Sequence, residues 1–304
     1  MPSWEDLAYE IQCTPSAIST VRGKYLSIMR EYTGRNVIAY YSAFLQKKGT
    51  LKTGIDDADK NAFMQAIYGL KKDEGLDLIL HTPGGNLAAT ESIVEYLKKM
   101  FNNDIRAFVP QIAMSAGTMM ALAAKEIIMG KQSNLGPIDP QFNGLSCAGI
   151  IEEFEGVCNA VKSDPDLIKV WALIISKYHP TFIGDCQKAI KWSKVMVKEW
   201  LKDNMFRNDK DRDKIVKKIV TFLSSHSKTY SHSKHIHFDK LKSLGLKVIA
   251  LENLDSKKIG GCRDLQDCVL TLHHAYMQTL ANSNAIKIIE NHLSKGLIIT
   301  VVNN

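Results

Sequence analysis

The first half of the chain alternates strand-like with helix-like segments, and this alternation constrains the fold more than any other feature. Apolar or β-branched runs typical of strands occur at 36–45, 76–82, 105–110 and 126–130. Between them lie a helical pattern that Asp56 or Asp57 can cap, another over 87–100, and a third beginning at about Ser115. Parallel strands are joined by long crossovers, usually helices, so the pattern predicts βαβ units and a parallel sheet with right-handed connections.

The remainder of the chain has a mostly helical pattern. We expect helices at 4–32, 149–163, 166–177, 183–204, 211–225, 238–244 and 264–293, with one strand-like run, KVIALE, before the last of them. The predicted fold class is therefore α/β with a mostly helical C-terminal portion. Its expected parts, with soft boundaries, are a helical segment at 1–35, an α/β core at 36–145 and a helical extension at 146–304.

Composition is that of an ordinary soluble globular protein, with 45% hydrophobic and 23% charged residues. The start, MPSWEDLAYEI, lacks the basic and apolar regions of a secretory signal, and no run reaches the length of a membrane span. A cytoplasmic location is expected. The six cysteines show no CxxC spacing, which favours reduced thiols over a disulfide or metal framework.

Positive charge is concentrated in one part of the chain. Between Lys188 and Lys247 there are 16 Lys and Arg against 6 Asp and Glu, whereas the whole chain carries a net charge of +7. An anionic partner would suit such a run, but a solvated lysine-rich helical face is the commoner origin. Trp192 and Trp200 lie in it without any nucleic-acid-binding motif, so helix packing is favoured and no nucleic-acid partner is expected.

Two strand-to-helix crossings carry residues suited to chemistry, HTPGGN at 81–86 and QIAMSAGT at 111–118. Parallel sheets place reactive groups at the carboxyl ends of their strands. Gly84 and Gly85 permit a close backbone approach to a ligand. Ser115 stands where a helix begins and backbone N–H donors are unpaired, which suits a developing oxyanion. Alternatively Ser115 is only a helix N-cap, but the pairing of the two turns one βαβ unit apart favours a site.

The segments HTPGGNLAATESIVEYLKK, IRAFVPQIAMSAGTMMALAAKEIIMG and LGPIDPQF, in this order, resemble the serine proteases of the Clp-fold superfamily. Within it the chain most resembles the serine dehydrogenase proteinase (SDH-type) group, related to signal peptide peptidase A, over nearly everything beyond about residue 35. The resemblance implies a Clp/crotonase-like fold, Ser115 as nucleophile, and the N–H groups of Gly85 and Ala116 as the oxyanion hole. It also implies a peptide or protein substrate and a homo-oligomer in which the late helical region takes part.

The general base has more than one candidate. Clp-type enzymes carry a histidine about 25 residues after the serine, where this chain has Asp139 and no histidine, so their Ser-His-Asp order does not carry over. Signal peptide peptidases use a later lysine, and the closest match here, in SKYHPT, is Lys177, with Lys169 second. Such a lysine must lose roughly 3 pKa units, which requires desolvation or a nearby positive charge. The apolar run WALII before Lys177 favours it.

Asp139, Gly84 and His81 are further candidates. Asp139 either orients another group or caps a turn, since a carboxylate beside a base lysine would oppose loss of its proton. Gly84 belongs to the glycine turn, and His81 precedes it, although a strand-end histidine is usually satisfied by backbone. His232, His235 and His237 are spaced as metal ligands can be, but no carboxylate or cysteine completes a set, so no metal is expected.

We therefore expect a serine hydrolase, a peptidase working through an acyl-enzyme with a Ser/Lys dyad. The alternatives are a catalytically inactive Clp-fold scaffold and crotonase-like acyl-CoA chemistry. No cofactor is expected, because no GxGxxG fingerprint follows a strand. Peripheral membrane association through a partner stays open.

Overall fold

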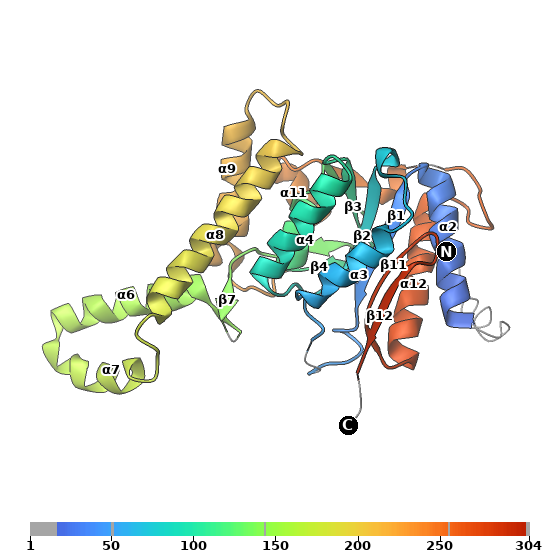
Figure 1. Ribbon diagram of the computed structural model, residues 1–304. Coiled ribbons are helices and arrows are strands. Elements are labelled where there is room, and N and C mark those ends of the chain that lie inside the picture. The colour runs from blue at the N-terminus through green and yellow to red at the C-terminus, as the bar shows by residue number, and fades with distance from the viewer. Residues whose placement is uncertain (1–16, 50–51, 143, 255, 302–304) are drawn as a thin grey trace.

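The computed structural model describes residues 17–49, 52–142, 144–254 and 256–301. Its centre is a seven-stranded sheet (Figure 1). In spatial order the strands are β10 (Val248–Ala250), β5 (Glu126–Met129), β3 (Ile105–Val109), β2 (Leu76–His81), β1 (Asn36–Ser42), β11 (Ala285–Asn291) and β12 (Gly296–Thr300). The first five are mutually parallel, and β11 and β12 are added antiparallel. The predicted α/β class with a mostly parallel sheet is confirmed.

Helices cover both faces of this sheet. One apolar core includes residues of α3 (Ala58–Ile67), α4 (Leu87–Met100), α5 (Ala116–Leu122), α8 (Phe182–Asp203) and α9 (Arg212–Leu223). The other includes residues of α2 (Ala17–Thr33) and α12 (Leu265–Asn282). Strand side chains alternate between faces, so Leu78 and Leu80 enter the first core and Ile79 enters the second.

A second, three-stranded sheet positions the candidate site. It contains β4 (Ile112–Ala113), β6 (Asn134–Leu135) and β9 (Ile236–His237). Strand β4 is parallel to β6, and β9 is antiparallel to β6. Three segments far apart in the sequence are thereby brought side by side.

Between β6 and β9 the chain forms an arm. It consists of the hairpin β7 (Gln141–Phe142) and β8 (Leu145–Ser146), then α6 (Cys147–Ser163), α7 (Ile168–Ile175) and α8, and it is followed by α9 and α10 (His226–Thr229). Figure 1 shows α6 and α7 extending well away from the central sheet. The remaining elements are α11 (Phe238–Leu244) and the 3₁₀ turns η1 (Lys72–Glu74), η2 (Pro165–Leu167) and η3 (Leu251–Asn253). None of the described helices is both long and apolar enough to cross a bilayer.

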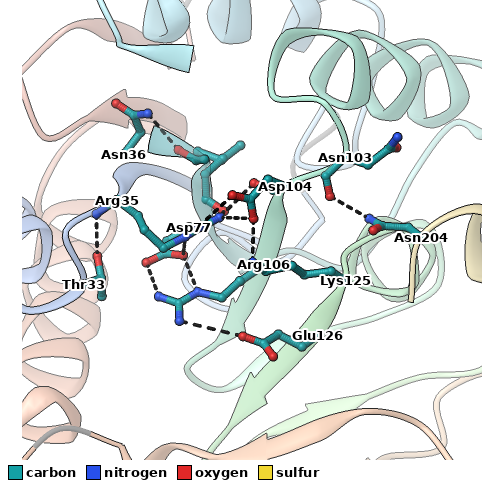
Figure 2. A network of polar contacts seen from close by, with 12 residues as sticks. Thr33, Arg35, Asn36, Asp77, Asn103, Asp104, Arg106, Lys125, Glu126 and Asn204 are labelled. Carbon is teal, nitrogen blue, oxygen red and sulfur yellow. Dashed lines mark hydrogen bonds and ion pairs between the residues drawn. The ribbon is translucent and has the colours of Figure 1, made fainter. Parts of the chain in front are cut away.

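The amino ends of β2 and β3 are tied together by charge. Asp77 is fully buried and accepts hydrogen bonds from Arg35 at 2.9 Å and from Arg106 at 2.7 Å. Arg35 also bonds Asp104, which pairs with Lys125 at 2.6 Å (Figure 2). This network lies at the end of the strands opposite to the glycine and serine turns, so it stabilises the sheet without contacting them.

The last part of the chain differs from its prediction. A helical region was expected over 264–293, but α12 ends at Asn282 and β11 begins at Ala285. Ser283 is extended, with φ −136° and ψ 174°, which stops the helix. Isoleucines in AIKIIEN fit helical spacing, yet β-branched residues also favour strands, and pairing with β1 decides the outcome. Residues 4–16 of the first predicted helical region lie outside the described residues.

The proposed division at residue 145 falls within the hairpin β7–β8, after the chain has left the central sheet at the end of β5. The segment 146–304 contains the helical arm, but it also returns to supply β10, β11 and β12, and α12 packs against α2. A helical extension therefore describes α6 to α9 better than it describes the whole of this segment.

Candidate active site

Ser115 occupies a strained turn between β4 and α5. The N–H of Gly117 donates to the carbonyl of Met114 at 2.8 Å, closing a four-residue turn. Ser115 has φ 52° and ψ −117°, the values of the first central position of a type II′ turn, where glycine is normally required. Holding a side chain there costs about 1–3 kcal/mol. The turn is sharp because the chain reverses from strand into helix within two residues.

The side chain of Ser115 does not cap the helix. It makes no capping hydrogen bond, and its hydroxyl takes part in none of the hydrogen bonds found among the described residues. The residue is half-buried, so the hydroxyl lies at the surface of a packed core. The N-cap interpretation therefore does not account for a serine in this strained position.

The glycine turn after β2 lies against Ser115. A Cβ built on Gly84 would be 2.7 Å from the Cβ of Ser115 and 2.9 Å from the nitrogen of Ala116. Gly84 has φ +99°, which side chains rarely adopt. Only glycine lets the two turns approach this closely.

Two backbone donors are left available beside the hydroxyl. Within the described parts of the chain, no hydrogen bond uses the N–H of Gly85 or of Ala116. Ala116 is the first residue of α5, where N–H groups have no helical partner. Gly84, the residue before Gly85, lies against both Ser115 and the nitrogen of Ala116, so the two available N–H groups belong to the two turns that meet here.

Asp139 and His232 form a close pair. The carboxylate of Asp139 is 1% exposed, and its Oδ1 lies 2.8 Å from Nδ1 of His232. A carboxylate can only accept, so Nδ1 donates this hydrogen bond, and in the neutral imidazole Nε2 is then the acceptor. The Oδ2 atom accepts from the hydroxyl of Ser146 at 3.1 Å, which fixes the carboxylate. His232 also lines a cavity of about 450 Å³ with aromatic residues Phe154 and Tyr178.

This pair lies at the same end of the small sheet as Ser115. The register pairs Ala113 with Leu135, and a Cβ on Gly136 would be 3.4 Å from the Cα of Met114, so the chains stay together beyond the strands. Asp139 follows three residues later. Because β9 is antiparallel to β6, the residues before Ile236, including His232, extend in the same direction.

From the sequence, His232 was considered only as a metal ligand. A usable signal was present, because serine, aspartate and histidine follow in that order, as they do in α/β-hydrolases. The comparison with Clp-type enzymes drew attention to the missing histidine near Asp139 instead.

Both lysine candidates lie on the arm. Lys177 follows the end of α7 and is exposed, and Lys169 on the same helix is 80% exposed and pairs with Asp166 at 3.0 Å. Figure 1 places α7 at the tip of the arm, far from β4, which leads into Ser115. Both lysine side chains are exposed, so this chain alone does not supply the desolvation that a neutral lysine requires, although Tyr178, next to Lys177, lines the cavity beside His232.

His81 is fully buried on the opposite face of the sheet. Its ring stacks among Tyr41, Phe44 and His273, with centroids 5.0 to 5.4 Å away. Burial, with a smaller contribution from His273, lowers the pKa of His81 well below its ordinary value. Neither ring nitrogen has a hydrogen-bond partner among the described residues, so the expected backbone partner is not found. In this arrangement His81 packs beneath the glycine turn and does not face Ser115.

A parallel α/β sheet with a serine turn and a glycine turn meeting at its carboxyl edge is the arrangement of the Clp-type fold. The family model described as ClpP-like SDH-type serine proteinase matches residues 51–257, and the chain belongs to this family. Two uncharacterized proteins of Methanocaldococcus jannaschii are 37% and 33% identical to it, each over 190 residues. The match covers 62% of this chain but only 57% and 59% of those relatives, less than two thirds of their length.

Proposed function

We propose that this chain is a serine peptidase in which Ser115 is the nucleophile, His232 the general base and Asp139 the residue that orients it. The N–H groups of Gly85 and Ala116 form the oxyanion hole. The observation that carries the proposal is that Ser115 is held in a strained turn against Gly84 while its hydroxyl makes no capping hydrogen bond to the helix. Strain of this kind persists where the surrounding structure enforces it, and such positions cluster at active sites.

The proposed reaction passes through an acyl-enzyme. Ser115 Oγ adds to the substrate carbonyl carbon as its proton passes to Nε2 of His232, and the two N–H groups stabilise the oxyanion. The imidazolium then gives the proton to the leaving nitrogen as the C–N bond breaks. Water, deprotonated by His232, attacks the resulting ester, and Oγ regains a proton as the carboxylic acid leaves. Asp139 stabilises the imidazolium that forms twice in this cycle.

His232 is preferred over Lys177 for two reasons. It is held by a buried carboxylate at the same end of the small sheet as Ser115. Lys177 is exposed on the arm. The Ser/Lys dyad remains the alternative, because a neighbouring chain in an oligomer would be able to bring an arm to the site.

A fluorophosphonate probe tests the assignment. We expect covalent labelling of the wild-type protein, loss of labelling in Ser115→Ala, and a loss of at least about 100-fold in labelling rate in His232→Ala. Lys177→Ala, the matched control, should label at the wild-type rate. Labelling that survives Ser115→Ala would overturn the nucleophile, and loss in Lys177→Ala with retention in His232→Ala would restore the Ser/Lys dyad. An intact fold without labelling would support the inactive-scaffold alternative.

We also propose that the chain forms a homo-oligomer through α7. Four apolar residues of this helix are exposed, Ile168, Val170, Leu173 and Ile174, with exposed fractions from 41% to 71%. Contiguous exposed apolar surface on a protruding arm favours a protein interface.

A further inference from the structure

Lys287 is a buried lysine whose contacts lead to the glycine turn. It lies on β11, and its side chain is 1% exposed. Its Nζ donates to the carbonyl of Gly54 at 2.9 Å and to Oδ2 of Asp56 at 2.9 Å. It also pairs with Oδ1 of Asp59 at 2.7 Å. One ammonium group therefore holds both the backbone and a side chain of the segment 54–56.

That segment is the immediate neighbour of the glycine turn. The N–H of Ile55 donates to the carbonyl of Gly84 at 2.8 Å, and the N–H of Asn86 donates to the carbonyl of Ile55 at 2.8 Å. A Cβ built on Gly85 would lie only 2.2 Å from the nitrogen of Ile55. The two backbones touch at Gly85, so the position of residues 54–56 sets the position of the Gly85 N–H.

The network around Lys287 is fixed from the other side as well. Asp59 is fully buried, and its Oδ2 accepts from the hydroxyl of Tyr40 at 2.9 Å and from the N–H of Asp56 at 3.0 Å. Burial raises the pKa of Asp59, and the hydrogen bond with Lys287 opposes that rise. A buried ion pair contributes little net stability compared with apolar packing, so its value here lies in directing one backbone segment.

We propose that Lys287 is a positioning residue for the oxyanion hole, acting through Gly54 to Asp56 on the glycine turn. It touches no substrate, and it lies outside the family-matched residues 51–257. The inference rests on the proposed function. It assigns to the C-terminal strand β11 a part in catalysis that neither the turn motifs nor the family match contains.

The test compares two double variants, each of which removes the buried ion-pair contacts of one residue of β11. Lys287→Met with Asp59→Asn removes the ion pairs of Lys287, and the amide oxygen of the new asparagine can still accept hydrogen bonds from the Tyr40 hydroxyl and the Asp56 N–H. The carboxylate of Asp56 is 38% exposed, so water can solvate it. The control is Arg22→Met with Glu290→Gln. It removes the ion pair between Arg22 and Glu290, whose atoms are 2.6 Å apart, and Glu290 lies on β11 as Lys287 does. Both variants are checked for folding by circular dichroism.

We expect the Lys287 double variant to lose about 10- to 1000-fold in kcat with KM changed less than about threefold, since one displaced oxyanion donor acts mainly on the transition state. Its amides at Ile55 and Asn86 should exchange hydrogen faster than in the control, whereas the control should keep kcat within about twofold of wild type. Lys287→Arg, which keeps the charge, should recover part of the activity.

Equal kcat and equal exchange at Ile55 and Asn86 in the two double variants would overturn the inference. A loss expressed in KM alone would also overturn it, because misplacement of an oxyanion donor lowers kcat. If the wild-type protein shows no Ser115-dependent labelling, the proposed function fails. The exchange comparison then still decides whether Lys287 holds the glycine turn.

Discussion

The imidazole of His232 lies 2.8 Å from the carboxylate of Asp139, although the two residues are 93 positions apart in the sequence. Antiparallel pairing of β9 with β6 brings them together, and β4 places Ser115 at the same end of the small sheet. The candidate catalytic groups thus come from three segments of one small sheet, while the central sheet supplies the glycine turn.

Asp139→Asn tests the orienting role of the carboxylate. An amide in this position can hold the imidazole in the wrong tautomer, and we expect kcat to fall by up to about 10⁴-fold with the fold intact. Ser146→Ala is the control, because it removes a second hydrogen bond of Asp139 and a cap of α6, at about 1 kcal/mol of stability, but leaves His232 paired. Steady-state peptide hydrolysis measures both, and an unchanged kcat in Asp139→Asn would contradict the role.

The strain at Ser115 predicts an unusual order of stabilities. Ser115→Gly should be more stable than Ser115→Ala by about 1 kcal/mol, because glycine adopts φ 52° without steric cost whereas alanine retains the Cβ. Both variants should be inactive. Urea unfolding gives the two free energies, and an alanine variant as stable as the glycine one would show that the turn is not strained.

Gly85→Ala should displace the glycine turn. The added methyl would lie 2.2 Å from the nitrogen of Ile55, so the pairing of residues 54–56 with the turn must shift, and we expect kcat to fall about 100-fold or more. Gly156→Ala, in the interior of α6 with nothing within 4 Å, should instead raise the free energy of unfolding by about 0.5–1 kcal/mol and leave kcat unchanged. Wild-type kcat in Gly85→Ala would contradict the assigned oxyanion donor.

The Asp104 network predicts part of the acid sensitivity of the fold. The hydrogen bond from Arg35, helped by Lys125, lowers the pKa of Asp104 from 3.8 to about 2. Because the folded state lowers the pKa of this carboxyl, its ionised form stabilises the fold above about pH 4, and this stability is lost as the pH falls through about 2. Asp104→Asn should therefore be less stable than wild type at pH 7 and nearly equal to it at pH 2.

Glu126→Gln is the control for that comparison, because Glu126 meets Arg106 only at 3.8 Å and should change little. Thermal unfolding between pH 2 and 7 measures all three proteins. A difference between wild type and Asp104→Asn that stays constant over this range would contradict the lowered pKa.

If the exposed apolar face of α7 forms the proposed interface, substitutions on this face should change the mass of the oligomer. Leu173→Glu places a charge at a residue that is 71% exposed, so it should leave the fold unchanged but reduce the oligomer measured by sedimentation. Lys169→Gln, on the same helix, should keep the wild-type mass. A monomeric wild-type protein, or an unchanged mass in Leu173→Glu, would remove the proposed interface.

Local patterns predicted the strands and helices around the two turns, because βαβ periodicity and the glycine and serine signals are encoded in short segments. The positions of the glycine turn and the serine turn were predicted for this reason. The pairing of Asp139 with His232 was not predicted, since it depends on how β9 returns to β6 across the intervening arm. Lys287 was missed because the isoleucine spacing of β11 also fits a helix, and only pairing with β1 shows that this lysine points inward.

A crystal structure of the protein labelled by a fluorophosphonate would show which residue is the nucleophile and which groups surround it. We expect phosphorus bonded to Ser115 Oγ, a phosphoryl oxygen about 2.7–3.1 Å from the nitrogens of Gly85 and Ala116, and His232 Nε2 within about 3.2 Å of an oxygen of the adduct. An adduct on another residue, or a lysine nitrogen in the place of His232, would contradict it.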